Sequence, residues 1–420
     1  MRKVIVAGAA LFLAATMSGG LTATAEAAKI TFTGDARARF YAEKDYATTT
    51  LPTTNIGEDK EESYWQSRVR LVFKIETKGG AYAMGRFRLA DTWPGSWDGG
   101  QSTLKYGEGS NLRTDVSYVG LPLGPFTVEA GVGPNTMSEF IRSDVPYDFV
   151  RAKFEKENTT VLAFMEKFDE YEETSVPVID AATGLSVDKL VIDDDYTSDD
   201  DINHYGLQLI QKFGDGWVLN AAALMKDDQQ HDEDGWAGVA SVMGKVGEIG
   251  LIAEAAFKNA AYQGNDDDGY GGYIGAKMPI GPASISVTFG GTFDGFTASG
   301  DFGGDGQEGY APFIMVGNAG NTEVIGMMNT GILLGSASGD AWFVNAAPSI
   351  RVSDKLTLLA EVSYVDTDTP TGSLSLVEVG GMASYQVVEG ASVTALLGYL
   401  DIEDSDADPL GFGLALDLTF

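Results

Sequence analysis

The C-terminal residues Leu410–Phe420 alternate strictly between large apolar residues and small or polar ones. One face would carry Leu410, Phe412, Leu414, Leu416, Leu418 and Phe420. The opposite face would carry Gly411, Gly413, Ala415, Asp417 and Thr419. A period of two predicts a β-strand with hydrocarbon on one side and water on the other. The alternative is the last strand of a soluble sandwich, because soluble antiparallel sheets alternate as well.

A similar alternation begins directly after residue 28. In residues 29–43, apolar residues such as Ile30 and Phe32 alternate with polar residues such as Arg37 and Arg39. We expect this strand to pair with the C-terminal strand and to close the sheet, which would leave no unpaired edge.

Between these two strands, about ten alternating residues, a tight turn, ten more residues and a longer loop recur. The tight turns fall at residues 78–80, 122–125, 156–159, 214–216, 247–248, 281–283, 352–355 and 388–390. The longer connections fall at residues 92–111, 135–147, 169–201, 227–235, 259–269, 295–340 and 403–409. Tilted strands that span a bilayer need about 9–11 residues. The sequence therefore predicts an all-β fold, a transmembrane antiparallel β-barrel with short periplasmic turns and long extracellular loops.

The count of alternating segments is eighteen, and sixteen or twenty strands remain open. The uncertain region is residues 295–340, where residues 312–317 and 324–334 are apolar. These stretches could form an extra hairpin or a packed loop. Barrels of 16–18 strands enclose an aqueous channel rather than a filled core.

The first 27 residues are typical of a secretory signal peptide. Arg2 and Lys3 form a basic start, residues 4–15 are an apolar run, and residues 25–27 offer an Ala-Glu-Ala cleavage site. The apolar run is short for a membrane-spanning helix. We therefore divide the chain into a signal peptide, residues 1–27, and a barrel domain, residues 28–420.

Composition narrows the possible functions. The formal net charge is −33 and the sequence pI is about 4.2, which argues against nucleic-acid binding because that needs a basic surface. The chain has no cysteine, which excludes disulfides and thiolate metal sites. Its 53 glycines and its many aromatic residues distinguish it from acidic disordered chains.

Two stretches resemble a known family. Tyr118, Val119, Gly120 and Leu121 precede a turn, and a second strand follows at residues 126–131. This strand–turn–strand unit, together with the terminal Phe420, is similar to Gram-negative outer-membrane porins. The resemblance implies an outer-membrane location, a homotrimer, and a loop after the second strand that folds into the pore. General porins have sixteen strands, whereas eighteen is the count of substrate-selective porins.

Arginines gather on the polar faces of the first strands. The predicted inward positions carry Arg37, Arg39, Arg68, Arg70, Arg86 and Arg88, followed by Arg113 and Arg151. Lumen faces tolerate charge, whereas the lipid face does not. From the resemblance, Glu139 and Asp144 in the inserted loop would face these arginines across the pore and create a transverse field. Alternatively, the arginines pair with neighbours such as Asp35 and Glu76.

Acidic runs lie in the predicted outer loops, and we predict no cofactor beyond a possible Ca²⁺ or Mg²⁺ there. The weak metal candidates are Asp232, Asp234, Asp266 and Asp268. Clustered carboxylates suit hard cations, which could bridge the loops to lipopolysaccharide. A solvated, self-repelling loop is the alternative.

These patterns favour a porin that conducts small hydrophilic solutes and ions passively, with membrane lipid and lipopolysaccharide as surroundings. One alternative is a barrel sheath around a partner protein, for example an electron-transfer conduit. Another is an outer-membrane hydrolase that uses His204 or His231. No serine lies in a Gly-x-Ser-x-Gly context, and we expect a protein that is not an enzyme.

Overall fold

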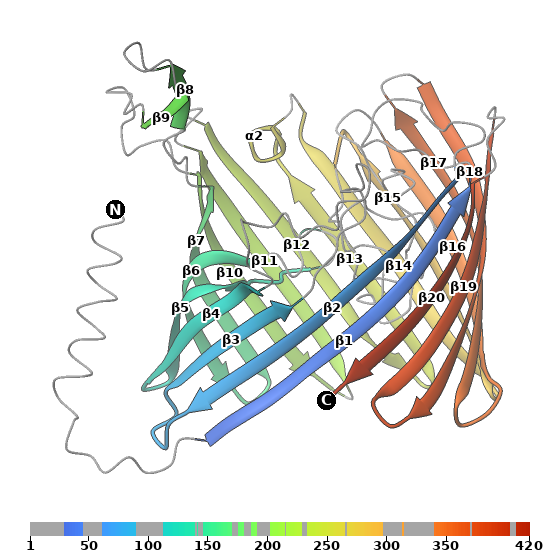
Figure 1. The fold of residues 1–420 in the computed structure, drawn as a ribbon, viewed down its shortest axis with the longest axis horizontal. Helices are drawn as coiled ribbons and strands as arrows, with labels where there is room; N and C mark the ends of the chain where they lie inside the picture. The colour runs from blue at the N-terminus through green and yellow to red at the C-terminus, as the bar shows by residue number, and fades with distance from the viewer. Residues whose placement is uncertain are drawn as a thin grey trace.

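The protein forms one closed antiparallel sheet of eighteen strands (Figure 1). The computed structural model describes residues 29–44, 61–89, 112–138, 141, 146–169, 175–179, 186–190, 202–214, 216–228, 233–264, 267–296, 313–314, 340–369, 372–403 and 409–420. The barrel strands are β1 (Lys29–Lys44), β2 (Glu61–Glu76), β3 (Tyr82–Leu89), β4 (Leu112–Leu123), β5 (Phe126–Pro134), β6 (Pro146–Lys156), β7 (Thr159–Asp169), β10 (Ile202–Phe213), β11 (Trp217–Asp228), β12 (Glu233–Val246), β13 (Ile249–Lys258), β14 (Gly269–Ile280), β15 (Ala283–Phe293), β16 (Ala341–Arg351), β17 (Leu356–Thr369), β18 (Gly372–Val388), β19 (Ala391–Ile402) and β20 (Leu410–Thr419).

Closure comes from pairing of the first and last strands, as the alternation predicts. β1 pairs with β2 on one side and with β20 on the other. At the end of this seam the backbone N–H of Gly34 donates to the Phe420 carbonyl at 2.8 Å, and the Phe420 N–H donates to the Gly34 carbonyl at 3.0 Å. The predicted count of eighteen strands is confirmed, so sixteen and twenty are set aside.

Short turns join neighbouring strands at one rim, and Phe420 lies near the same rim (Figure 1). All eight tight turns predicted from the sequence fall between paired strands. Six of them contain a glycine with positive φ, and Gly247 and Gly281, both with φ of 62°, are examples. A side chain with a Cβ would be strained there, and glycine is not.

The long connections were predicted less completely. Within the predicted connection 169–201 the structure has a separate hairpin, β8 (Ser175–Ile179) with β9 (Ser186–Leu190), which stands beyond the barrel rim (Figure 1). A short helix, α2 (Ala260–Gln263), lies in the connection between β13 and β14. Among the described residues, no helix is long and apolar enough to cross a membrane.

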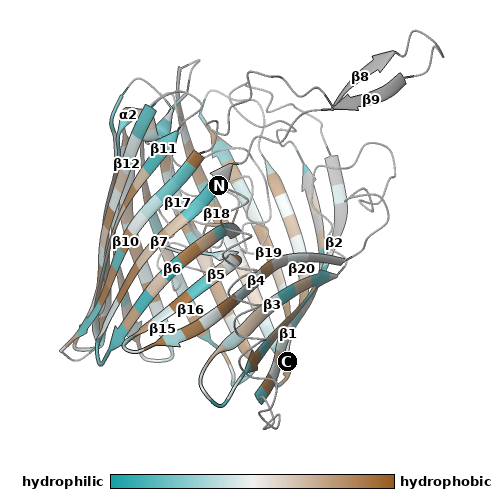
Figure 2. Cartoon of the chain, turned by 90° about the vertical axis from the view of Figure 1, so that its left-hand side faces the viewer, coloured by the Kyte–Doolittle hydropathy of each residue, from teal (hydrophilic) through white to brown (hydrophobic). Residues whose placement is uncertain are grey.

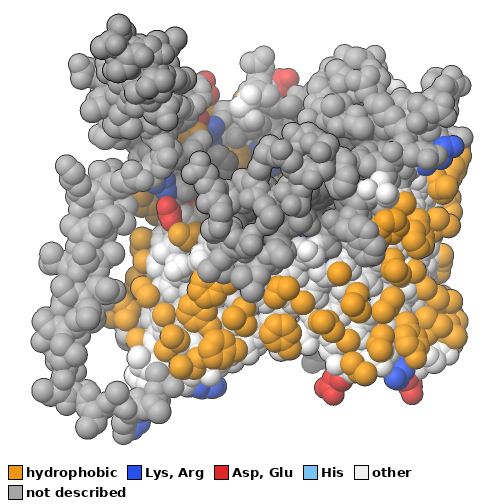
Figure 3. Space-filling model, viewed as in Figure 1, with side chains coloured by type: hydrophobic (Ala, Val, Ile, Leu, Met, Phe, Trp, Pro, Cys, Tyr) orange, Lys and Arg blue, Asp and Glu red, His pale blue; other side chains and the backbone are white. Residues whose placement is uncertain are grey.

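Hydrophobic and polar residues alternate along the strands (Figure 2), and hydrophobic side chains cover much of the described outer face of the barrel (Figure 3). In β20, Leu410, Phe412, Leu414, Leu416 and Leu418 are each 41–44% exposed. The alternate residues Gly411, Gly413 and Ala415 are buried instead. The predicted assignment of faces is therefore confirmed on this strand. The proposed signal peptide, residues 1–27, lies outside the described residues.

Candidate functional site

The arginines of β1 and β2 lie on the inner face of the barrel and are held by two acidic neighbours. In the register, Arg37 lies opposite Arg68, and Asp35 lies opposite Arg70. Asp35 accepts from Arg70 at 2.7 Å and from Arg68 at 3.4 Å. Arg39 forms an ion pair with Asp417 of β20 at 3.8 Å. Guanidinium groups remain charged in such contacts. The four arginines therefore form a positively charged surface, here called the basic wall, which the two carboxylates hold in place and neutralise only in part.

Beside this wall lies a cavity of about 620 Å³. Its charged lining consists of Arg37, Arg39, Arg68, Arg70, Asp35 and Asp417. Hydroxyl groups of Ser384, Ser392 and Thr394 from β18 and β19 belong to the same lining. Four guanidinium groups against two carboxylates give the lining a net charge of +2. A space with polar walls and excess positive charge can hold water and small anions.

The remaining arginine candidates continue along the sheet. Arg88 of β3 lies opposite Arg70 of β2, and Arg113 of β4 lies opposite Arg88. Arg86 is half-buried on the same strand as Arg88. The side chain of Arg113 and all of Glu139 and Asp144 lie outside the described residues. The predicted opposition of loop carboxylates and arginines therefore stays a prediction.

Next to the wall is an aromatic and charged cluster. Glu129 of β5, 3% exposed, accepts hydrogen bonds from the Tyr82 hydroxyl and the Arg151 guanidinium. The Arg151 guanidinium lies 4.6 Å from the centre of the Phe149 ring and 5.6 Å from that of Tyr118. Of this group, only Arg151 is among the inward arginines predicted from the sequence to line the pore. The other four occupy inward positions, so strand alternation could have placed them beside it.

The connection after β5 turns into the barrel, as the resemblance implied for this loop. Asn135, Met137, Ser138 and Ile141 are buried. The Met137 carbonyl accepts from the side chain of Gln208 at 3.5 Å and from that of Asn220. These bonds attach the described part of the loop to the inner faces of β10 and β11.

A second inserted segment consists of Phe313 and Ile314, both buried inside the barrel. The Phe313 ring meets Phe343 of β16 edge-on, with centroids 5.5 Å apart. The Ile314 N–H donates to Glu378 of β18 at 2.7 Å. For residues 312–317 the sequence allowed an extra hairpin or a packed loop. The two described residues form a packed segment rather than strands. Residues 324–334 lie outside the described part of the chain.

Buried apolar side chains from strands between β7 and β19 and from the inserted segments pack together inside the barrel. Met137, Phe296 and Phe313 join a cluster with the inward side chains Phe164, Leu224 and Leu400. The arginine-lined cavity lies against β1, β2, β18, β19 and β20, and Leu396 of the cluster is part of its lining. The cavity is therefore bordered both by the arginines and by apolar side chains.

The hydrolase candidate His204 is buried on β10. It lies opposite Glu166 of β7 and Lys226 of β11, and its ring stacks on Tyr262 of α2 at 5.7 Å. This placement packs the imidazole beneath a rim helix. His231 lies outside the described residues.

The acidic candidates for metal binding are only partly described. Asp234 and Asp268 are exposed, and Asp268 accepts the Ala260 N–H at 2.9 Å. Asp232 and Asp266 lie outside the described part. Among described side chains, no group of three or more His, Asp or Glu is placed to hold a metal ion.

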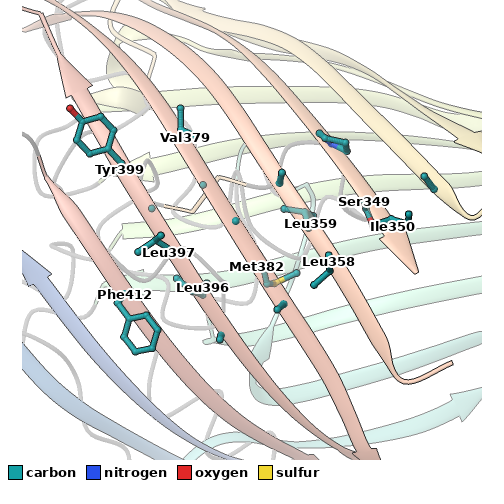
Figure 4. A pocket seen from close by; sticks show the side chains of 18 residues that line it. Ser349, Ile350, Leu358, Leu359, Val379, Met382, Leu396, Leu397, Tyr399 and Phe412 are labelled. Atoms are coloured by element: carbon teal, nitrogen blue, oxygen red, sulfur yellow. The ribbon is translucent and has the colours of Figure 1, made fainter. Parts of the chain in front are cut away.

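The outer surface carries an apolar hollow of about 900 Å³ over β16 to β20 (Figure 4). Leu358, Val379, Leu397, Tyr399 and Phe412 surround it. Small residues form its floor: Ala360, Gly381, Ala383 and Ala395.

Comparison with known proteins gives matches in structure only. No family model matches the chain, and no curated protein matches it in sequence. A BenF-like porin from Pseudomonas fluorescens Pf-5 is similar over 93% of this chain and 98% of its own, with 12% identity and a TM-score of 0.58.

Two porins of Pseudomonas aeruginosa match over the same shares of both chains, 93% and 98%. OpdK, solved with vanillate, is 14% identical with a TM-score of 0.57, and OccK8 (OprE) is 11% identical with a TM-score of 0.56. At these identities the likeness concerns the fold, which is that of an eighteen-stranded outer-membrane porin.

Proposed function

We propose that this protein is an outer-membrane porin through which small hydrophilic solutes and ions diffuse passively. The observation that carries the proposal is a closed sheet with an apolar outer surface and a polar, arginine-lined cavity of about 620 Å³ inside. Within lipid, a β-sheet can pair the backbone N–H and C=O groups of all its strands only if it closes into a barrel. The proposed role is that of a channel and not of a catalyst.

The permeation path runs along the basic wall. The cavity lies there, and the buried apolar cluster borders it at Leu396. Charges in a narrow space with low-dielectric walls act strongly on a passing ion. The net charge of +2 on the cavity lining favours anions. Glu139 and Asp144 in the inserted loop would add a transverse field by facing the inward arginines of the first three strands, which are Arg37, Arg39, Arg68, Arg70, Arg86 and Arg88.

Small anionic solutes are the substrate class that this lining suits. The structural relative OpdK was solved with vanillate, a small aromatic carboxylate. The arginines of the basic wall can pair with the carboxylate of such a solute, and the rings of Tyr118 and Phe149 lie nearby against Arg151. We propose membrane lipid and lipopolysaccharide as surroundings, Ca²⁺ or Mg²⁺ at the acidic loops, and a homotrimer.

Planar-bilayer recording of the purified protein tests the proposal. A porin gives ohmic conductance that rises with salt, and a gradient of KCl gives a reversal potential that favours chloride. A sheath around a partner protein would instead give little conductance until the partner is removed. Closed channels from a protein that is folded and partner-free would contradict the proposed function.

A further inference from the structure

A row of inward residues crosses the four strands β3 to β6 and ends at Arg151. In the register, Tyr82 lies opposite Gly120, and Gly120 lies opposite Glu129. Glu129 in turn lies opposite Arg151. A Cβ at Gly120 would lie 2.4 Å from the Tyr82 ring. Because glycine leaves this space open, the ring lies over β4 and its hydroxyl reaches Glu129 on β5.

Two different N–H groups of Arg151 are used as donors. The Nε–H donates to the Glu129 carboxylate, and an Nη1–H donates to the Pro134 carbonyl at 3.2 Å. Both side chains of the ion pair are largely shielded, with 13% of Arg151 and 4% of Glu129 exposed. The centre of the Phe149 ring lies 4.6 Å from the same guanidinium group. Because this group is planar and rigid, these contacts fix its direction as well as its position.

Pro134 is the last residue of β5, and the chain turns into the barrel directly after it. It lies opposite Pro146, and a proline has no N–H to donate across the ladder. Pro146 therefore cannot supply a donor to the Pro134 carbonyl, and Arg151 supplies one. Further along, the Met137 carbonyl accepts from Asn220. The inserted loop is thus held at its start from β6 and at a later point from β11.

We propose that Arg151 is a positioning residue that sets where residues 135–138 enter the lumen, rather than one of the charges that attract a solute. Glu129 directs the guanidinium group, and the guanidinium group holds the carbonyl at which the loop begins. The described lining of the arginine-lined cavity does not include Arg151. The effect of this contact on conduction rests on the proposed porin function, whereas the position of the loop does not.

Cysteine labelling tests this directly, because the chain contains no cysteine of its own. Met137→Cys introduces one thiol at a side chain that is 1% exposed, and it keeps the backbone carbonyl that Asn220 binds. The readout is the rate of modification by a methanethiosulfonate reagent, measured at constant pH on folded protein in detergent. Ala347→Cys, at a buried inward position of β16, reports general loosening of the barrel. Heat-dependent gel mobility checks that each barrel is folded.

We expect Arg151→Gln to raise the labelling rate of Met137→Cys by at least about tenfold, because the loop loses a hydrogen bond from a charged donor. Lys153→Gln is the matched control. It removes one positive charge from the same face of β6, and Lys153 forms an ion pair with Glu155 at 2.7 Å. The control should label at the parent rate, and the Ala347→Cys rate should rise in neither variant.

Arg151→Lys is the conservative variant and also serves if the glutamine variant does not fold. Its labelling rate should lie between those of the parent and Arg151→Gln, because an ammonium group keeps the charge but lacks the rigid fork of donors. A parent-like rate in every folded Arg151 variant would overturn the proposal, as would a rise that Lys153→Gln or Ala347→Cys shares. The readout needs no conductance, so this result and the bilayer test of the porin function can fail independently.

Discussion

Asp35 is the residue that connects the arginines of two strands. It accepts from Arg70 at 2.7 Å and from Arg68 at 3.4 Å, and Arg68 is only 3% exposed. A buried guanidinium that loses its carboxylate keeps its charge. Removing the carboxylate lowers the free energy of unfolding by about 3–5 kcal/mol where burial is complete. At the edge of a hydrated cavity, we expect water to offset part of this cost.

Asp35→Asn should therefore raise the anion preference of the channel. The substitution changes the charge of the cavity lining from +2 to +3 and keeps the shape of the side chain. The reversal potential in a KCl gradient should shift further toward that of chloride, with a modest loss in thermal stability. Asp417→Asn, which removes the longer ion pair with Arg39, is the matched control and should shift selectivity in the same direction. A shift toward cations would contradict the proposed path.

Gly34 lies at the seam where β1 meets the C-terminal end of the chain, and its backbone is hydrogen-bonded to Phe420. A Cβ at this position would lie 2.4 Å from the Arg70 carbonyl oxygen and 2.8 Å from the Phe420 ring. The carbonyl belongs to the sheet backbone and cannot move aside.

We expect Gly34→Val to lower the yield of folded barrel strongly, since overpacking costs about 1–3 kcal/mol even where side chains can adjust. Heat-dependent gel mobility after refolding measures the folded fraction. Ala36→Val, two residues along β1 on the same side of the strand, is the control and should fold normally. Equal yields from both variants would show that this contact does not limit closure.

Residue-level roles were predictable from the sequence only as far as alternation determines them. The period of two places Arg37, Arg68 and Arg70 inside, and the structure agrees. The same rule places Glu361 and Glu378 inside but cannot show that Phe313 and Ile314 cover them. That cover is a contact between positions about fifty residues apart in the chain, and strand periodicity carries no information about it.

At the scale of elements, the strands and short turns were more predictable than the long connections. In a barrel strand, residues that face lipid alternate with residues that face water, so the sequence itself shows the two faces. Most of the tight turns contain glycine or proline, and the turns at residues 156–159 and 352–355 are mostly polar. The hairpin β8–β9 lacked such a signal within an acidic stretch and was missed. The segment after β5 was expected to enter the barrel only because of the family resemblance, and its described residues do so.

Asn220 is expected to hold that segment in place, because its amide donates to the Met137 carbonyl inside the barrel. Loss of this donor leaves a buried carbonyl with fewer partners, a cost of about 1–3 kcal/mol. Asn220→Ala should therefore increase the labelling rate of a cysteine introduced at Met137. Ser241→Ala, at the opposite register position on β12, is the control. Unchanged labelling in the Asn220 variant would show that other contacts suffice.

At the scale of the whole molecule, charge is distributed unevenly. The full chain has a formal net charge of −33, yet the lining of the cavity carries +2. Acidic residues lie in the long connections, so an anion approaching the mouth is repelled before the basic wall attracts it. The sequence shows both charge groups but not which one controls selectivity, because that depends on their distances from the path.

Salt concentration should separate these two influences. The Debye length falls from about 10 Å at 0.1 M salt to about 3 Å at 1 M, and exposed charges are screened far more than enclosed ones. We therefore expect anion preference, measured as the reversal potential at a fixed concentration ratio, to increase from low to high salt. Replacing Arg68 and Arg70 with Glu in one variant should convert the preference at high salt to cations, because it reverses the charge of the enclosed wall. A parent channel that prefers cations at both salt concentrations would place control of selectivity in the acidic connections.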